Sequence, residues 1–146
     1  MDASELPAIF NSTVIVDSSI VIDYLADRHT PETEWLESNL GRRRICITAL
    51  ILTEILQGIR SDHEFTETLA ALDLFDLLTA TDREVAIRSA QNYRTLRKKG
   101  ITIRNTIDCL TATFCIQNGF ELLQNDRDFA PFAKHLRLVV VHVSDR

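Results

Sequence analysis

Residues 13–17 read TVIVD, a run of four strand-forming residues followed directly by an aspartate. A second apolar run, LVVV at residues 138–141, lies near the other end of the chain. Strands without a polar face fit a sheet that is covered on both sides. Because helical patterns separate the strand patterns, the sequence predicts an α/β fold, a three-layer α/β/α sandwich with a central, mainly parallel sheet.

The remaining elements follow from periodicity and from cap and stop residues. Helices are expected at residues 18–26, 31–40, 49–59, 63–74, 83–99 and 107–118, with a helical turn or short helix at 128–134. Strands are expected at residues 13–17, 44–47, 75–79, 121–124 and 138–143. Ser18 is a candidate N-cap of the first helix. The helix at 49–59 is apolar nearly all round, which predicts that it is largely buried.

The 146 residues are expected to form a single domain, with residues 1–12 as an N-terminal extension. A domain of this size buries roughly 70% of its unfolded surface, so one core suffices. The N-terminus has no continuous apolar stretch, no run is long enough to cross a bilayer, and the 3 cysteines show no CxxC spacing. These features predict a cytoplasmic protein with free thiols and without a membrane segment.

The charge of the chain excludes a uniformly basic surface for nucleic acid. The formal net charge is −5 and the sequence pI is about 5.3. Carboxylates that hold a divalent cation lower the net charge and still make their site attractive to phosphate. Basic residues cluster at 42–44 and 94–99, and each cluster is either a solvated face or a phosphate contact.

Four of the 21 acidic residues stand where a carboxylate is costly or well placed for chemistry. Asp17 and Asp126 follow predicted strands, at the end of the sheet where ligands of parallel α/β folds bind. Glu54 lies within the apolar stretch ALILTEIL, and Asp108 lies in the first turn of an apolar helix. Each also has a purely structural interpretation: a cap, an exposed helix stripe, helix-start chemistry or a turn.

Together, these acids predict a cation site. Carboxylates gathered at one sheet edge repel one another unless a cation neutralises them. All the donors are oxygens and no Cys or His spacing suits zinc, which favours Mg²⁺ or Mn²⁺. Such ions serve phosphodiester hydrolysis. Arg104 and Arg127, beside these acids, are candidate phosphate contacts or solvated loop arginines.

Four motifs in order carry a resemblance to a known family. They are VDSSIVIDYL at 16–25, ITALILTEILQGI at 47–59, NTIDCLTATFCIQNG at 105–119 and LLQNDRDF at 122–129. Through these motifs the chain resembles the PIN domain over about residues 13–141, and more narrowly the VapC toxins of bacterial toxin–antitoxin pairs. The resemblance implies a metal-dependent endoribonuclease that cleaves cellular RNA, is inhibited by a VapB-type antitoxin and forms a homodimer.

The resemblance also assigns roles to individual residues. It implies that Asp17, Glu54, Asp108 and Asp126 are the catalytic and metal-holding acids. Whether Glu54 ligates the metal or acts as general base stays open. Ser19 matches a small polar residue that supports the first aspartate, and Asp128 matches a further acidic position. Asn125 departs from the basic or hydroxyl residue that many members carry there.

Two other functions remain open from the residues alone. A phosphotransferase with an aspartate nucleophile, as in haloacid-dehalogenase-like proteins, needs a second acid two residues after the first, where this chain has Ser19. A receiver-like regulatory domain pairs its acids with a lysine that follows a late strand. Lys134, the only late lysine, follows a helix-like segment instead.

Overall fold

The computed structural model describes residues 13–144, so the extension expected at 1–12 lies outside the described residues. Five parallel strands form one sheet in the order β3-β2-β1-β4-β5. The strands are β1 (Thr13–Val16), β2 (Arg44–Thr48), β3 (Asp76–Leu78), β4 (Glu121–Leu123) and β5 (Val139–Val140). The predicted parallel sheet is therefore confirmed.

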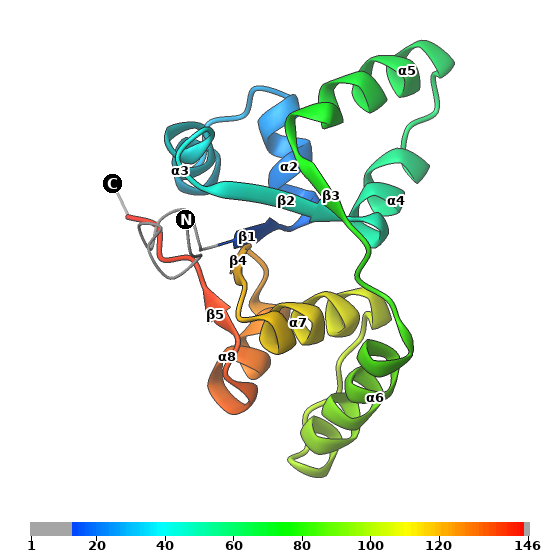
Figure 1. Cartoon of the computed structure of the whole chain (residues 1–146), viewed down its shortest axis with the longest axis vertical. Coiled ribbons are helices and arrows are strands. Elements are labelled where there is room, and N and C mark those ends of the chain that lie inside the picture. Colours follow the sequence, from blue (N-terminus) through cyan, green and yellow to red (C-terminus); the bar gives the residue numbers. More distant parts are fainter. Residues whose placement is uncertain (1–12, 145–146) are drawn as a thin grey trace, which may run out of the picture.

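The helices cover both faces of this sheet. They are α2 (Ser18–Leu25), α3 (Pro31–Asn39), α4 (Ala49–Gln57), α5 (Asp62–Ala71), α6 (Arg83–Lys98), α7 (Thr106–Asn118) and α8 (Ala130–Leu136), with 3₁₀ turns at Leu72–Leu74 and Arg127–Phe129. In Figure 1, α2, α3 and α5 lie above the central strands and α6 to α8 lie below them, and α4 packs against α2. The arrangement is the predicted three-layer α/β/α sandwich.

The centre of the sheet is the centre of the core. All four residues of β1 are buried, and Val14, Ile15 and Val16 have no exposed surface. Leu122 and Leu123 of the neighbouring β4 are equally inaccessible. Both central strands carry apolar side chains on both faces because helices pack on both faces. The apolar run at residues 13–16 thus forms the middle strand of the sheet.

The connections create a switch point between β1 and β4. From β1 the chain moves to β2 on one side, and the later β4 is added on the other side. The backbone N–H of Asp17 donates to the carbonyl of Leu123 at 3.0 Å, so the pairing continues to the residue after β1. In open parallel sheets, ligands bind beyond the carboxyl ends of the strands at such a point.

The edge strands differ from the prediction. A last strand at 138–143 covered on both sides was expected, but β5 has only two residues, and Val139 is 54% exposed. At the opposite edge, Leu77 of β3 is 55% exposed. The helices cover the middle of the sheet, so an apolar run at an edge is only partly covered. Hydrophobicity alone does not distinguish an edge strand from a central one.

The prediction that the helix at 49–59 is largely buried is also wrong. The helix, α4, ends at Gln57, and only Ile51 and Ile55 are buried. Ala49 and Thr53 are exposed. An outer-layer helix packs on its neighbours through one face, and the other face meets solvent even where it is apolar.

Candidate active site

Asp17 occupies the N-cap position of α2, which corrects the expectation that Ser18 caps this helix. Its backbone is extended (φ −67°, ψ 152°), but its side chain accepts no capping hydrogen bond. Asp17 Oδ2 instead lies 3.2 Å from Ser19 Oγ, which also lies 3.2 Å from Asn125 Oδ1. The purely structural role of Asp17 as a helix cap therefore does not account for its carboxylate. Ser19 links the segments that follow β1 and β4.

Asp108 lies in the first turn of α7 and is 8% exposed. The preceding Asn105 is the N-cap, and its Oδ1 accepts from the backbone N–H of Ile107 at 2.9 Å. Because this cap fixes where the helix begins, it also fixes the direction in which Asp108 leaves the first turn. Asp108 has no capping bond of its own and is not needed to start the helix.

Asp126 combines a structural and a potential chemical role. It precedes the 3₁₀ turn Arg127–Phe129, and its Oδ1 accepts from the backbone N–H of Asp128 at 2.9 Å. This turn brings the two carboxylates toward Asp108. Carboxylate oxygens of Asp108, Asp126 and Asp128 all lie within 4.8 Å of one another. Asp126 therefore does stabilise a turn, as its structural interpretation predicts, and this turn helps to bring the three carboxylates together.

Glu54 lies in the middle of α4, which packs against α2. Its side chain is partly covered, and its Oε1 is a buried oxygen without a hydrogen-bond partner among the described residues. Leaving a buried carboxylate oxygen unpaired is costly. The exposed stripe considered for this helix exists at Thr53, but it does not explain the buried oxygen of Glu54.

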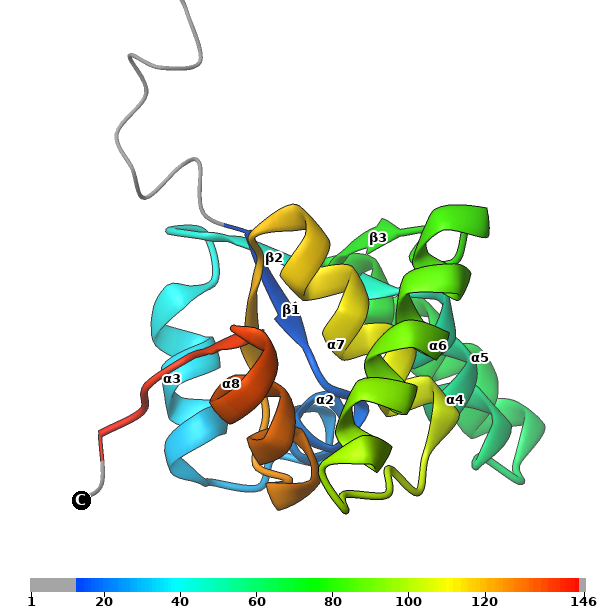
Figure 2. The same ribbon diagram turned by 90° about the horizontal axis from the view of Figure 1, so that it is seen from below.

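Four of these acids, Asp17, Glu54, Asp108 and Asp126, line one pocket of about 510 Å³. The lining residues are Asp17, Ser18, Ser19, Glu54, Asn105, Asp108, Asn125, Asp126 and Arg127. The structure therefore brings together the four acids that the sequence singled out, from four separate segments. Figure 2 shows the end of β1 and the beginning of α7 at the same end of the molecule.

The electrostatics of the pocket are dominated by crowded, partly buried acids. Burial, as the largest cause, and repulsion by the neighbouring carboxylates together raise the pKa of Asp108 from 3.8 to about 7. Burial also raises the pKa of Asp17, although the N–H of Ser18 and the hydroxyl of Ser19 offset part of this effect. The pKa of Glu54 is raised by burial and by the charge of Asp17. The site favours protonation or a bound cation over free carboxylates.

The donor set fits a hard divalent cation. It offers several carboxylate oxygens, three of them on mutually close residues, and one buried oxygen of Glu54 that lacks a partner. Oxygen-only donors suit Mg²⁺, Mn²⁺ or Ca²⁺ rather than zinc. The group of mutually close acids includes Asp128, for which the sequence predicts only a supporting position.

The predicted phosphate contacts are divided between two neighbouring hollows. Arg127 lines both the carboxylate pocket and the adjoining groove, whereas Arg104 lines the groove alone. Asn105 was missed by sequence reasoning, although a helix N-cap three residues before Asp108 is a detectable signal. The sequence cluster at 42–44 is largely engaged elsewhere, since Arg43 pairs with Glu121 and Arg44 with Asp76.

The PIN domain family matches residues 14–135 of the chain. Ribonuclease VapC1 of Methanocaldococcus jannaschii is 31% identical over 119 residues, which cover 81% of this chain and 79% of that protein. VapC ribonuclease Mb1587 of Mycobacterium bovis is 26% identical over 123 residues, covering 83% of this chain and 92% of that protein.

Solved structures share the fold. The chain superimposes on VapBC2 from Rickettsia felis, bound to a promoter DNA fragment, with a TM-score of 0.73, 17% identity, and coverage of 88% of this chain and 97% of that chain. VapBC-1 from nontypeable Haemophilus influenzae gives a TM-score of 0.70, 16% identity, and coverage of 88% and 96%. The family match over residues 14–135 and the 31% identity to Ribonuclease VapC1 establish that the chain belongs to the PIN domain family, among the VapC ribonucleases.

Proposed function

We propose that this protein is the toxin of a type II toxin–antitoxin pair, an endoribonuclease that hydrolyses cellular RNA with Mg²⁺ or Mn²⁺. One observation carries the proposal: Asp17, Glu54, Asp108 and Asp126 come from four segments and line one pocket. Among the described residues, none of these four acids forms an ion pair. Relatives that are named VapC ribonucleases support the reaction class.

In this proposal Asp17, Asp108 and Asp126 hold the ion, directly or through water, and Asp128 adds a nearby oxygen. A divalent ion there would activate water and stabilise the leaving oxygen of the phosphodiester. Glu54 either joins the ligands or orients the attacking water through its unpaired Oε1. The Ser19 hydroxyl lies within hydrogen-bond distance of both Asp17 Oδ2 and Asn125 Oδ1, so it holds the Asp17 carboxylate close to the segment that follows β4.

The alternatives considered for the sequence find less support in the pocket. A receiver-like domain needs a lysine among its acids, but Lys134 lines the neighbouring groove and is absent from the residues that line the carboxylate pocket. An aspartate-nucleophile phosphotransferase needs an acid at the position of Ser19, whose hydroxyl instead supports Asp17.

The proposed partner is a VapB-type antitoxin, and we expect the toxin itself to be a homodimer. Both solved neighbours come from VapBC pairs. Several large apolar side chains of α5 and the segment after it are exposed, such as Phe65 and Leu74. Light scattering should give twice the chain mass of 16.6 kDa.

We propose a cytoplasmic location for the protein. No helix in the described range 13–144 has the length and apolar character to span a membrane.

The decisive experiment is an RNA cleavage assay with total bacterial RNA, with Mg²⁺, Mn²⁺ or EDTA. The wild-type protein should cleave RNA with either metal and not in EDTA. Asp17→Asn should lower the rate at least about 100-fold, because it removes a charge from the group that binds the ion. Asp73→Asn, the same change on an exposed aspartate, should leave the rate unchanged. Undiminished cleavage by Asp17→Asn would refute the site.

A further inference from the structure

The carboxylate pocket is continuous with a groove of opposite charge. The groove has a volume of about 570 Å³. It is lined by Ile101, Thr102, Ile103, Arg104, Arg127, Asp128, Ala130, Pro131, Lys134 and His135. Arg127 lines both hollows, and Asp128 belongs both to the groove and to the group of close acids. The two hollows therefore meet at the 3₁₀ turn that follows β4.

The cations of the groove are available to a ligand. Within residues 13–144, the side chains of Arg104, Arg127 and Lys134 form no ion pair or hydrogen bond with the protein. All three are exposed. The groove thus has three cations against the single carboxylate of Asp128. This excess is local, because the whole chain has a net charge of −5.

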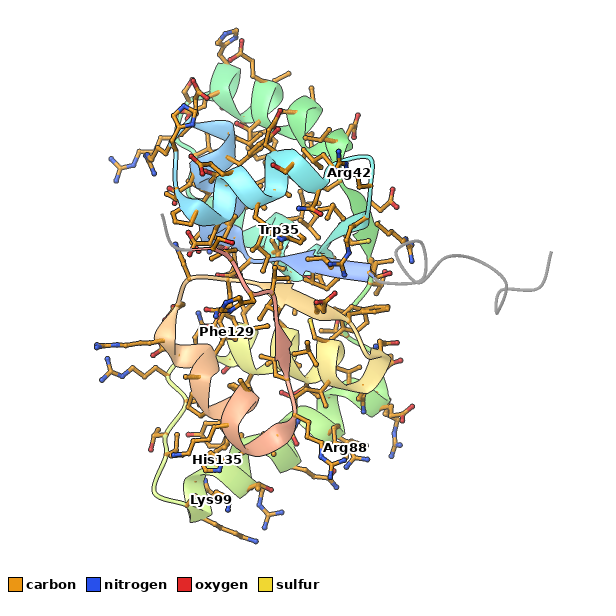
Figure 3. The ribbon with its side chains drawn as sticks, turned by 90° about the vertical axis from the view of Figure 1, so that its left-hand side faces the viewer. Trp35, Arg42, Arg88, Lys99, Phe129 and His135 are labelled. Carbon is orange, nitrogen blue, oxygen red and sulfur yellow. The ribbon has the colours of Figure 1, made fainter. Side chains whose placement is uncertain are left out.

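The basic character continues beyond the groove. His135 also lines the next hollow, together with Arg88, Asn92, Ile116, Gln117, Leu136 and Arg137. Figure 3 places His135 and Arg88 in the same end of the molecule, whereas Arg42 lies at the other end. The groove and this hollow therefore share His135, and the hollow adds the cations Arg88 and Arg137.

We propose that the groove of Arg104, Arg127, Lys134 and His135 holds successive phosphates of the RNA strand on one side of the scissile bond. This inference rests on the proposed function, which assigns an RNA strand as the substrate. The crowded acids repel a polyanion, so binding energy for the strand has to come from cations nearby. Ile101 and Pro131 add apolar surface against which a ribose or base can pack.

The groove also gives the strand a direction. Because Arg127 stands at the junction, the phosphate that it contacts is next to the reacting one, and Lys134 and His135 contact phosphates farther along the chain. An acidic protein tail is the competing occupant. RNA is favoured because Arg127 lines both the groove and the carboxylate pocket, so a strand bound in the groove also reaches the acids.

The test is the binding of a fluorescein-labelled 12-nucleotide oligouridylate, followed by anisotropy in EDTA so that no cleavage occurs. The double variant Arg104→Ala/Lys134→Ala should bind at least tenfold more weakly at 0.1 M salt. The slope of log K against log salt should fall by about 1.4 in magnitude, because each phosphate contact on a single strand contributes about 0.7. With Mg²⁺, its KM for RNA should rise while kcat stays near the wild-type value.

The matched control is Arg42→Ala/Arg60→Ala, which removes the same charge from exposed positions outside the groove. This control should keep the affinity and the salt slope of the wild-type protein. Equal losses in both double variants, or no loss in the groove variant, would overturn the proposal. Displacement of the RNA by an oligoglutamate of equal charge at equal concentration would overturn it as well, since the groove would then accept any acidic polymer.

The outcome separates this inference from the proposed function. If the wild-type protein cleaves RNA and the groove variant binds RNA as tightly as wild type, then the nuclease proposal stands and the role of the groove in RNA binding is refuted. A selective loss of binding in the groove variant, with no cleavage by the wild-type protein in Mg²⁺ or Mn²⁺, would support the groove and refute the nuclease.

Discussion

Asp108 shows how a functional residue can work against the stability of its own protein. Burial and four neighbouring acids raise its pKa to about 7, so ionisation is unfavourable in the folded state. Each unit of pKa difference between folded and unfolded states corresponds to about 1.4 kcal/mol. The fold tolerates this cost because the rest of the core is well buried and a cation would offset the charge.

Asp108→Asn should therefore stabilise the metal-free protein while abolishing RNA cleavage. The amide removes a charge that the folded state disfavours, and we expect a gain of about 1 kcal/mol at pH 8, or about 2–5 °C in Tm. Thermal unfolding in EDTA measures this gain. Asp73→Asn is the control, because Asp73 is exposed and should leave Tm unchanged. A Tm of Asp108→Asn below that of the wild-type protein in EDTA would contradict the conclusion that the charge of Asp108 destabilises the folded state.

The four acids that line the pocket were predictable from the sequence, but the approach of Asp128 to Asp108 and Asp126 was not. Asp17 and Asp126 were recognisable because strand ends converge at one edge of a parallel sheet. One carboxylate oxygen each of Asp108, Asp126 and Asp128 nevertheless lies within 4.8 Å of the other two, and Asp128 had only a supporting position in the prediction. This grouping depends on a turn in which Asp126 accepts the N–H of Asp128, and on the direction in which Asn105 starts α7. Such local geometry is not determined by a hydrophobic pattern.

At the scale of elements, cap and stop residues predicted several helix boundaries, although Asp17 and not Ser18 is the N-cap of α2. Thr30 forms a capping box with Thr33 at the start of α3, and Asp82 caps α6 through the N–H of Val85 at 2.8 Å. Gly119 ends α7 in the left-handed conformation (φ +68°). Burial was less predictable, because it depends on how many neighbours an element has. The apolar α4 and the edge strand β5 both look central in sequence and lie at the periphery.

The cap of α4 supports both the helix and the site, because α4 carries Glu54. Thr48 has no exposed surface, and its hydroxyl accepts from the N–H of Ile51 at 3.2 Å. Thr48→Ala should cost about 2 kcal/mol, since it removes a cap and leaves a buried N–H without a partner. Chemical denaturation with urea measures the loss.

Two variants control for this interpretation. Thr48→Ser keeps the hydroxyl and should recover most of the stability. Ser61→Ala removes the cap of α5, which has no buried residues, and should cost clearly less than Thr48→Ala. If Thr48→Ser is as unstable as Thr48→Ala, then the lost methyl group and not the cap explains the effect.

For the whole molecule, the acidic pocket makes stability depend on both pH and metal. The pKa of Asp108 is raised above its unfolded value, so its contribution to stability is fully present below pH 3.8 and is lost as the pH rises to about 7. The raised pKa values of Asp17 and Glu54 act in the same direction. A cation that binds only the folded state stabilises it by mass action and replaces the lost protons.

We therefore expect the Tm of the protein in EDTA to fall between pH 5 and pH 8, and to fall less in 10 mM Mg²⁺ than in EDTA. The stabilisation by Mg²⁺ should be larger at pH 8 than at pH 5, because protons compete with the ion for the same oxygens. A fluorescence-monitored thermal scan across this grid of conditions measures both effects. Asp108→Asn should flatten the pH dependence in EDTA and weaken the response to Mg²⁺. A Mg²⁺ effect that is the same at both pH values would mean that the ion binds outside the carboxylate pocket.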